Sequence, residues 1–175
     1  MAIKEILKMG NPKLREMSRK IEDQEFSSNY LENLIEDMRE TMEDANGIGI
    51  AAPQIGELVQ VAIVCIESDN PRYEDEEEFE ELIVINPQIE YLTKELSGNW
   101  EGCLSVPGLR GYVERPSAVR VKFQDIDGKF ETIESDNFAA IVLQHELDHL
   151  FGKLYVDRIS NMKNLVYEDQ LITND

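Results

Sequence analysis

The most regular hydrophobic pattern in the chain begins after Ser28. Apolar residues recur there at intervals of three and four, which is the spacing of one face of an α-helix. These positions are Leu31, Leu34, Ile35, Met38 and Met42. Ser28 and Asn29, with Glu32 following, are typical of a helix start, and Asn46-Gly47 is typical of a helix end. We therefore predict an amphipathic helix over this stretch, with its methionines filling the core.

A second helix is predicted near residue 138 by a different pattern. Residues 138–143 are apolar on every side of a helix, and Ser135, Asp136 and Asn137 precede them as N-cap candidates. Gly152 follows as a stop signal. A helix that is apolar all round belongs inside a domain, so we expect this one to be buried.

Shorter apolar or alternating runs predict strands. Residues 59–66, 82–87 and 89–92 are strand-like, and the proline at position 87 is expected to end the second of them. Residues 119–123 alternate between apolar and polar side chains, and an Asp-Gly turn leads from them to residues 130–133. These last two runs predict a hairpin just before the buried helix.

Stretches rich in glycine, proline and serine predict irregular structure. Residues 4–20 are expected to form an extended arm with a short turn, and residues 98–108 a shaped loop. In residues 47–54, small residues alternate with isoleucine, and the local pattern favours a helix stop followed by a tight turn. A phosphate-binding loop is excluded because no Gly-Lys-Ser/Thr ending is present and the glycines follow a helix. Gln54 is left unexplained by this interpretation.

Composition limits the class of protein. With 175 residues and 42% hydrophobic content, the chain has the size and make-up of one globular domain over residues 1–175. No apolar run approaches the roughly 18 to 20 residues of a membrane span, and the start lacks the features of a signal peptide. We expect a cytoplasmic protein that does not contact a membrane. Cys65 and Cys103 then read as two thiols with separate roles.

The charge balance excludes another class of partner. The formal net charge is -19, with 36 acidic and 17 basic residues, so no basic footprint for nucleic acid is expected. Much of the excess lies in residues 74–81, which are nearly all carboxylates. Such runs are typical of solvated loops, and we assign no function to this one.

The candidate chemistry lies at the end of the buried helix. His145 and His149 are the two histidines of the chain, and four residues separate them, so both can reach one metal ion from one helix face. Glu146 would sit beside the ion and take a proton from bound water, which is the arrangement for metal-assisted hydrolysis. The alternative is a solvated acidic helix with two incidental histidines. A third ligand is needed, and Cys103, between a glycine and a predicted turn, is favoured over Cys65 in a predicted core strand.

Three ordered segments resemble the peptide deformylases. These are a Gly-Φ-Gly-Φ-Ala-Ala-x-Gln segment at residues 47–54, a Glu-Gly-Cys-Leu-Ser segment at residues 101–105, and a Gln-His-Glu-x-Asp-His segment at residues 144–149. The resemblance extends to about residue 155. It implies an α+β fold in which antiparallel β-sheets surround a central metal-binding helix.

The resemblance also implies a role for each matching residue. Cys103, His145 and His149 would hold the metal, with water as the fourth ligand. Glu146 would act as general base and acid when the bound water attacks the formyl carbon of an N-formylmethionyl peptide, releasing formate. The remaining catalytic residues would be Gln54 and Leu104, whose side-chain amide and backbone N–H would stabilise the oxyanion.

The implied substrate site holds the methionine side chain in an apolar pocket and pairs the peptide backbone as an added strand. Its residues would be Gly47, Ile48, Gly49, Gly102, Arg110, Phe138, Ile141 and Val142. The resemblance implies one Fe(II) ion per chain, with zinc, nickel or cobalt as substitutes. Its partners would be nascent formylmethionyl peptides. A transient ribosome contact is compatible with the resemblance, but residues 159–175 lack the long basic C-terminal helix of many relatives.

Two rival functions remain at this point. A metalloprotease of the His-Glu-x-x-His type shares the helix and the general base, but takes its third ligand from a downstream histidine, glutamate or aspartate. No histidine follows His149. A closed structural metal site in a non-catalytic module would need a fourth protein ligand, for which Asp148 or Cys65 is available.

Overall fold

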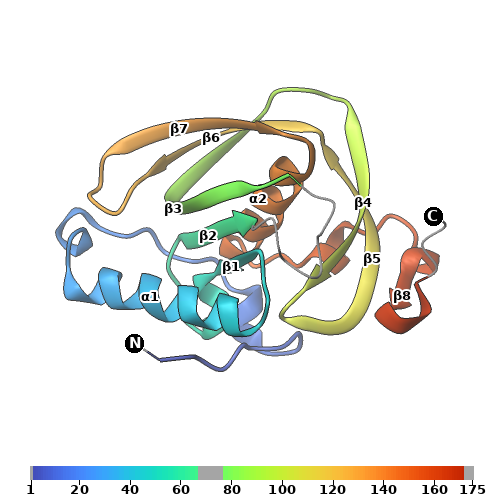
Figure 1. Ribbon diagram of the computed structural model, residues 1–175, viewed down its shortest axis with the longest axis horizontal. Coiled ribbons are helices and arrows are strands. Elements are labelled where there is room, and N and C mark those ends of the chain that lie inside the picture. The colour runs from blue at the N-terminus through green and yellow to red at the C-terminus, as the bar shows by residue number, and fades with distance from the viewer. Residues whose placement is uncertain (1, 67–76, 172–175) are drawn as a thin grey trace.

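The computed structural model describes residues 2–66 and 77–171, and in this part of the chain two α-helices pack with two antiparallel sheets (Figure 1). The larger sheet has the order β1 (Gly49–Ala51), β2 (Val61–Ile66), β3 (Phe79–Tyr91), β6 (Ala118–Gln124) and β7 (Phe130–Asp136). The smaller sheet has the order β4 (Leu96–Cys103), β5 (Val106–Pro116) and β8 (Leu165–Tyr167). None of the helices described has the length and hydropathy needed to cross a bilayer.

The first predicted helix is α1 (Asn29–Asp44), which lies against one face of the larger sheet. Ser28 caps it by accepting a hydrogen bond from the Leu31 N–H at 3.3 Å, as its sequence pattern indicates. Its apolar stripe packs against sheet residues such as Ile63, while the neighbouring residue Val64 points to the opposite face. Both faces of β2 are therefore buried, which explains its continuous apolar run.

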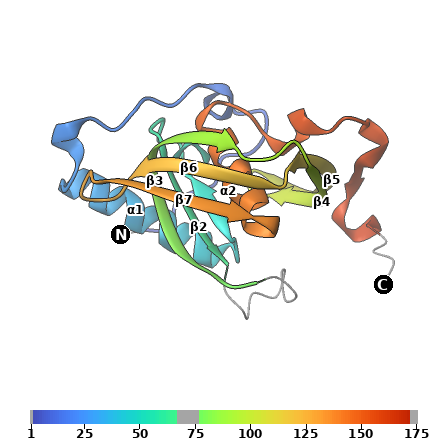
Figure 2. The same ribbon diagram turned by 90° about the horizontal axis from the view of Figure 1, so that it is seen from above.

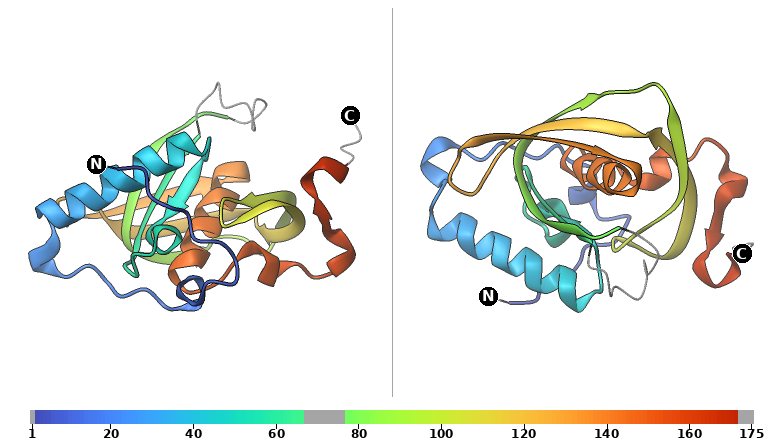
Figure 3. Two further views of the ribbon diagram at one scale, coloured as in Figure 1. Left: turned by 90° about the horizontal axis from the view of Figure 1, so that it is seen from below. Right: turned by 45° about the horizontal axis from the view of Figure 1, so that its top comes forward.

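The second predicted helix is α2 (Asn137–Leu150), which occupies the centre of the molecule. Every residue from 140 to 150 is buried. The right-hand view of Figure 3 looks nearly along α2 and shows strands of both sheets wrapping around it. Gly152 has φ +68° just after the helix, in agreement with its prediction as the stop signal. The predicted fold class, α+β with antiparallel sheets around a central helix, is confirmed.

The predicted loop at residues 98–108 is wrong, because most of it forms the hairpin of β4 and β5. Gly98 and Gly102 serve close packing between strands instead of turns, whereas Gly108 has φ +76° and no close neighbour among the described residues. A Cβ atom on Gly98 would lie 2.0 Å from the Tyr112 hydroxyl oxygen, and one on Gly102 would lie 2.9 Å from the Arg110 guanidinium carbon. A glycine-rich pattern therefore concealed two strands.

The expected end of a strand at Pro87 is also wrong, because β3 continues through it. The pairing between β3 and β6 shifts register between Ile85 and Gln88, and Asn86 has φ +52° there. This irregularity places the proline where no ladder hydrogen bond from its nitrogen is required. Of the acidic stretch, residues 74–76 lie outside the described residues. Its last three residues begin β3, where Phe79 packs against the core and Glu80 and Glu81 are exposed.

Short elements complete the chain. The hairpin predicted from the alternating runs is present as β6 and β7, and the predicted turn in the N-terminal arm is a 3₁₀ turn at Pro12–Arg15. After α2 the chain forms 3₁₀ turns at Tyr155–Arg158, Met162–Asn164 and Glu168–Gln170, with β8 between the last two. Figure 2 shows this C-terminal segment outside β4 and β5. Up to residue 171 it contains no long helix.

Candidate metal centre and active site

The two sheets and α2 bring three potential metal ligands together. The Sγ atom of Cys103, at the end of β4, lies 3.3 Å from Nε2 of His149 on α2. One ligand atom each from Cys103, His145 and His149 lies within 4.8 Å of the other two, and all three residues are buried. Cys65 instead packs in the core cluster on the α1 side of β2. The thiol that lies beside the two histidines is therefore Cys103, the one that the sequence favoured.

A buried ionic network holds the first histidine in place. Nδ1 of His145 donates to Oε2 of Glu101 at 2.8 Å, which leaves the other ring nitrogen to face the cluster. Arg115 bridges Glu101, at 2.6 and 2.9 Å, and Asp148, at 2.8 Å. Burial raises the pKa of Glu101, but the hydrogen bonds from His145 and Arg115 outweigh it and hold that pKa below its usual range. Glu101 therefore stays ionised and fixes the imidazole.

The same network removes Asp148 from the list of metal ligands. Its carboxylate accepts hydrogen bonds from Arg115 and from Arg158, at 2.5 and 3.0 Å. Neither arginine, nor Glu101, was singled out in the sequence, where each is one charged residue among many. The sequence feature that could have pointed to Glu101 is its position two residues before the predicted ligand Cys103. With Asp148 occupied and Cys65 on the other face of the sheet, no fourth protein ligand for a closed site is found among the described residues.

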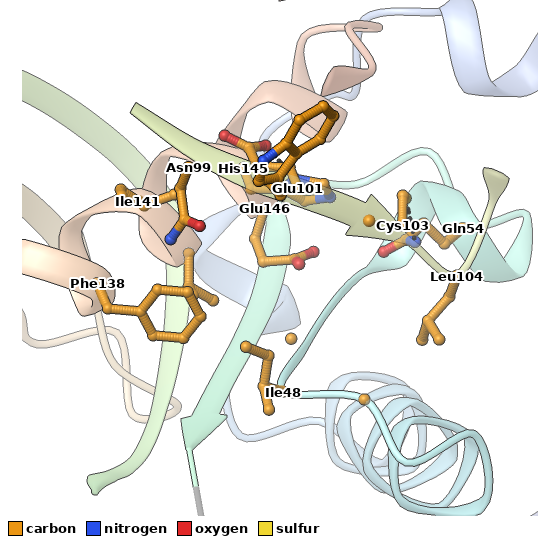
Figure 4. A pocket seen from close by; sticks show the side chains of 15 residues that line it. Ile48, Gln54, Asn99, Glu101, Cys103, Leu104, Phe138, Ile141, His145 and Glu146 are labelled. Carbon is orange, nitrogen blue, oxygen red and sulfur yellow. Dashed lines mark hydrogen bonds and ion pairs between the residues drawn. The ribbon is translucent and has the colours of Figure 1, made fainter. Parts of the chain in front are cut away.

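Glu146 projects from α2 beside the ligand cluster (Figure 4). It is buried, and among the residues described its Oε2 atom has no hydrogen-bond partner. Burial raises the pKa of Glu146 to about 7. The backbone of Gly49 lies against this side chain, because a Cβ atom there would be 2.6 Å from Oε1 of Glu146. A buried carboxylate with one oxygen free of hydrogen bonds and a pKa near neutral is suited to accept and donate protons.

Gln54 lies in the 3₁₀ turn Ala52–Ile55 that follows β1. Its Oε1 atom accepts from the Ala51 N–H at 2.8 Å, while its Nε2 donates toward Ser105 Oγ at 3.2 Å and Cys103 Sγ at 3.6 Å. The oxygen therefore braces the turn, and the amide N–H groups point toward the ligand cluster. The expectation of a turn alone at residues 47–54 accounts for only one of these three contacts, and it also missed strand β1.

A pocket with an empty volume of about 580 Å³, including its open mouth, lies over this cluster. It gathers seven of the eight residues expected to bind substrate: Gly47, Ile48, Gly49, Gly102, Phe138, Ile141 and Val142. Arg110 is not part of the lining, since its guanidinium lies against Gly102 from the outside. Asn99 and Trp100, which the sequence did not single out, extend the wall (Figure 4).

The donor set fits a single divalent ion. One thiol and two imidazoles at these separations match the ligand sets that proteins offer to zinc, iron and related metals. Burial, followed by the charge of His145, holds the pKa of His149 well below its usual range, so this ring is available in the neutral form that binds metal. Nδ1 of His149 is buried and has no hydrogen-bond partner in the described part of the chain.

Comparison with known proteins identifies the family. The family model described as Polypeptide deformylase matches residues 3–165. The chain belongs to this family. It is 47% identical over 173 residues to the peptide deformylase of Leptospira biflexa, covering 99% of this chain and 97% of that protein. It is 43% identical over 171 residues to peptide deformylase 1 of Nitrosomonas europaea, covering 97% of this chain and 94% of that one.

Solved structures agree with the sequence relatives. The Met-Ala-Ser-bound class I type b peptide deformylase of Acinetobacter baumannii superposes with a TM-score of 0.87 at 39% identity, covering 90% of this chain and 99% of that one. The resemblance drawn from the three motifs is confirmed. The chain is an enzyme of the peptide deformylase family, a metal-dependent hydrolase that removes the formyl group from the N-terminus of newly made polypeptides. Both rival functions are thereby set aside.

Proposed function

We propose that Cys103, His145 and His149 hold one divalent metal ion and that Glu146 moves the protons of deformylation. The observation that carries this assignment is the convergence of the three ligand atoms, within 4.8 Å of one another, beside a buried carboxylate whose Oε2 atom has no hydrogen-bond partner among the described residues. The metal, when bound, would act as a Lewis acid and lower the pKa of a water molecule. The protein groups proposed around it come from α2, β4, the β4–β5 turn and the turn after β1.

Glu146 performs the proton transfers in this proposal. It accepts a proton from the attacking water as the new C–O bond forms at the formyl carbon. It then donates that proton to the amide nitrogen as the C–N bond breaks, which releases formate and a free amino terminus. The pKa of about 7 that burial gives to Glu146 suits both directions of transfer near neutral pH.

Gln54 and Leu104 stabilise the negative charge that develops on the formyl oxygen. The Gln54 amide is already oriented, because its Oε1 is held by the Ala51 N–H at 2.8 Å. Its Nε2 faces Cys103 and Ser105 at the end of the β4–β5 hairpin, where the Leu104 backbone N–H is also located. Donors fixed before the reaction do not reorganise as charge develops, which is the source of their effect on rate.

The substrate is an N-formylmethionyl nascent peptide. The apolar side chains of Ile48, Phe138, Ile141 and Val142 in the pocket wall suit a methionine side chain, and an A. baumannii relative has been crystallised bound to Met-Ala-Ser. Gly47, Gly49 and Gly102 also line this pocket, and the peptide backbone would pair along them, with Arg110 beside Gly102.

We further propose Fe(II) as the metal in the cell, with Zn(II), Ni(II) or Co(II) able to substitute, since a thiolate and two imidazoles suit all four. Residues 1–175 are taken as one catalytic domain that acts in the cytoplasm. In a transient contact with the ribosome, residues 159–171 would not act as a basic helix, because they form 3₁₀ turns and β8.

The experiment is formate release from N-formyl-Met-Ala-Ser by protein purified without oxygen, with elemental analysis of the same samples. We expect about one metal ion per chain in the wild type and in Glu146→Gln, with nearly all activity lost in the variant because the amide cannot carry the proton. Loss of the metal in Glu146→Gln would make Glu146 a ligand and overturn its assignment as the base.

A further inference from the structure

The C-terminal segment reaches the outer side of the substrate pocket. Strand β8 pairs with β5 so that Val166 lies opposite Arg110. The 3₁₀ turn that follows places Glu168 beside the same arginine. Figure 1 shows this segment alongside β5, at the end of the molecule away from the β6–β7 turn. The match to the family model ends at residue 165, so Glu168 lies beyond it.

Arg110 is held between the C-terminal segment and the pocket wall. Oε1 of Glu168 accepts from Nη2 of Arg110 at 2.6 Å and from Nε at 2.9 Å. The Arg110 side chain is 12% exposed, whereas that of Glu168 is 45% exposed. On its other side, the guanidinium lies so close to Gly102 that a Cβ atom there would be 2.9 Å from Cζ. One guanidinium therefore separates the Glu168 carboxylate from a residue that lines the pocket.

We infer that Glu168 is a specificity-determining residue, which neutralises and positions Arg110 beside Gly102 and thereby sets the preference among charged residues that follow the formylmethionine. The inference rests on the proposed path of the substrate along Gly102. A peptide on that path places its second and third residues near the outer side of the pocket. There, the Glu168 carboxylate disfavours acidic side chains and favours basic ones, both directly and by cancelling the charge of Arg110.

The effect must be modest, because the pair is partly exposed. Exposed ion pairs in proteins contribute up to about 1 kcal/mol, so removing one charge changes relative rates by about fivefold at most. The change must also weaken as ionic strength rises, since salt screens such interactions. These two properties distinguish an electrostatic role of Glu168 from a structural one.

The test measures kcat/KM on three amidated peptides: N-formyl-Met-Ala-Glu, N-formyl-Met-Ala-Ala and N-formyl-Met-Ala-Lys. In Glu168→Gln we expect the acidic-to-neutral ratio to rise by about two- to fivefold and the basic-to-neutral ratio to fall, with both changes shrinking at high salt. Glu168→Ala, which also removes the hydrogen bonds to Arg110, should change both ratios in the same directions. The matched control is Glu131→Gln. Glu131 lies on β7, is 42% exposed and is paired with Lys129, so this variant removes a similar carboxylate far from Arg110.

Unchanged ratios in Glu168→Gln overturn the inference, even if Glu168→Ala is affected, because charge would then play no part. Equal changes in Glu131→Gln also overturn it, since they would report the net charge of the protein alone. Failure of the proposed function looks different: none of the peptides would release formate with metal-loaded wild-type protein. The two outcomes are therefore separable in one set of measurements.

Discussion

The close contact between Gly49 and Glu146 allows a sharp prediction for Gly49→Ala. The new Cβ atom would lie 2.6 Å from Oε1 of Glu146 and 2.8 Å from its Cδ and Cγ. Ordinary contact begins near 3.4 Å, so the carboxylate must withdraw by about 0.8 Å. Gly49 lies in β1 and does not have positive φ, so alanine fits its backbone conformation and the fold is retained.

The expected cost falls on catalysis. Misplacement of a catalytic group by about 1 Å can cost about 100-fold in rate, so we expect kcat/KM for formate release to fall by about 30- to 100-fold. This corresponds to about 2 to 2.7 kcal/mol in activation free energy. The metal content should stay at the wild-type value, because the displaced carboxylate is not a ligand in the proposed site.

The assay is steady-state formate release, with metal content and melting temperature measured on the same protein. Gly47→Ala is the graded comparison. Its Cβ would lie 3.1 Å from Cδ1 of Leu104, 3.2 Å from Cγ of Met42 and 3.3 Å from the Met42 backbone oxygen, which are all longer contacts than those at Gly49, so a smaller loss is expected. In a Glu146→Gln background, Gly49→Ala should cost little more, since the two changes disable the same group. Wild-type activity in Gly49→Ala, or a loss that accompanies loss of metal, would refute the reasoning.

Three further predictions follow from the site. Cys103→Ser should lose most of its metal, whereas Cys65→Ser should keep it, as elemental analysis of both will show; the reverse result would assign the ligand to Cys65. Gln54→Ala should lower kcat by about 100-fold in the folded, metal-loaded enzyme, and an unchanged kcat beside a lower melting temperature would leave Gln54 only its bracing role. Burial raises the pKa of Asp148, but the hydrogen bonds and charges of Arg158 and Arg115 outweigh burial and hold that pKa below its usual 3.8. The ionised carboxylate therefore stabilises the fold above the unfolded pKa, and this stability is lost as pH falls through the folded pKa. The melting-temperature advantage of the wild type over Asp148→Asn should accordingly be constant near neutral pH and shrink below about pH 4; an advantage unchanged there would contradict the ion pairing.

Sequence patterns located the helices better than the strands, for a physical reason. Both helices carry strong periodic or all-apolar runs, with Ser28 and Gly152 as signals at the start of α1 and the end of α2. The β4–β5 hairpin does not alternate, because Gly98 and Gly102 are required by side chains from the opposite strand. Such a requirement comes from tertiary packing and leaves no local signature.

The candidate site shows the same division. Cys103 and the two histidines could be proposed because metal chemistry restricts residue type and spacing. The residues that hold them in place could not be proposed, because Glu101 and Arg115 contact the helix only after the two sheets have packed around it. Likewise, β8 and Glu168 act through pairing with β5, which no pattern within the C-terminal segment indicates.

The three proposed ligands come from two different layers of the fold: Cys103 belongs to the smaller sheet, while His145 and His149 belong to the central helix. A bound ion would therefore act as a cross-link between two parts of the fold that are otherwise joined by side-chain packing and ion pairs. Since the unfolded chain does not hold these three residues together, metal binding must add to the free energy of unfolding, by about 2.7 kcal/mol at a free metal concentration 100 times Kd. Thermal unfolding at graded metal concentrations should thus report site occupancy without any turnover. Removal of the metal by a chelator should weaken the contact between the smaller sheet and α2 before it exposes the α1 side of the core.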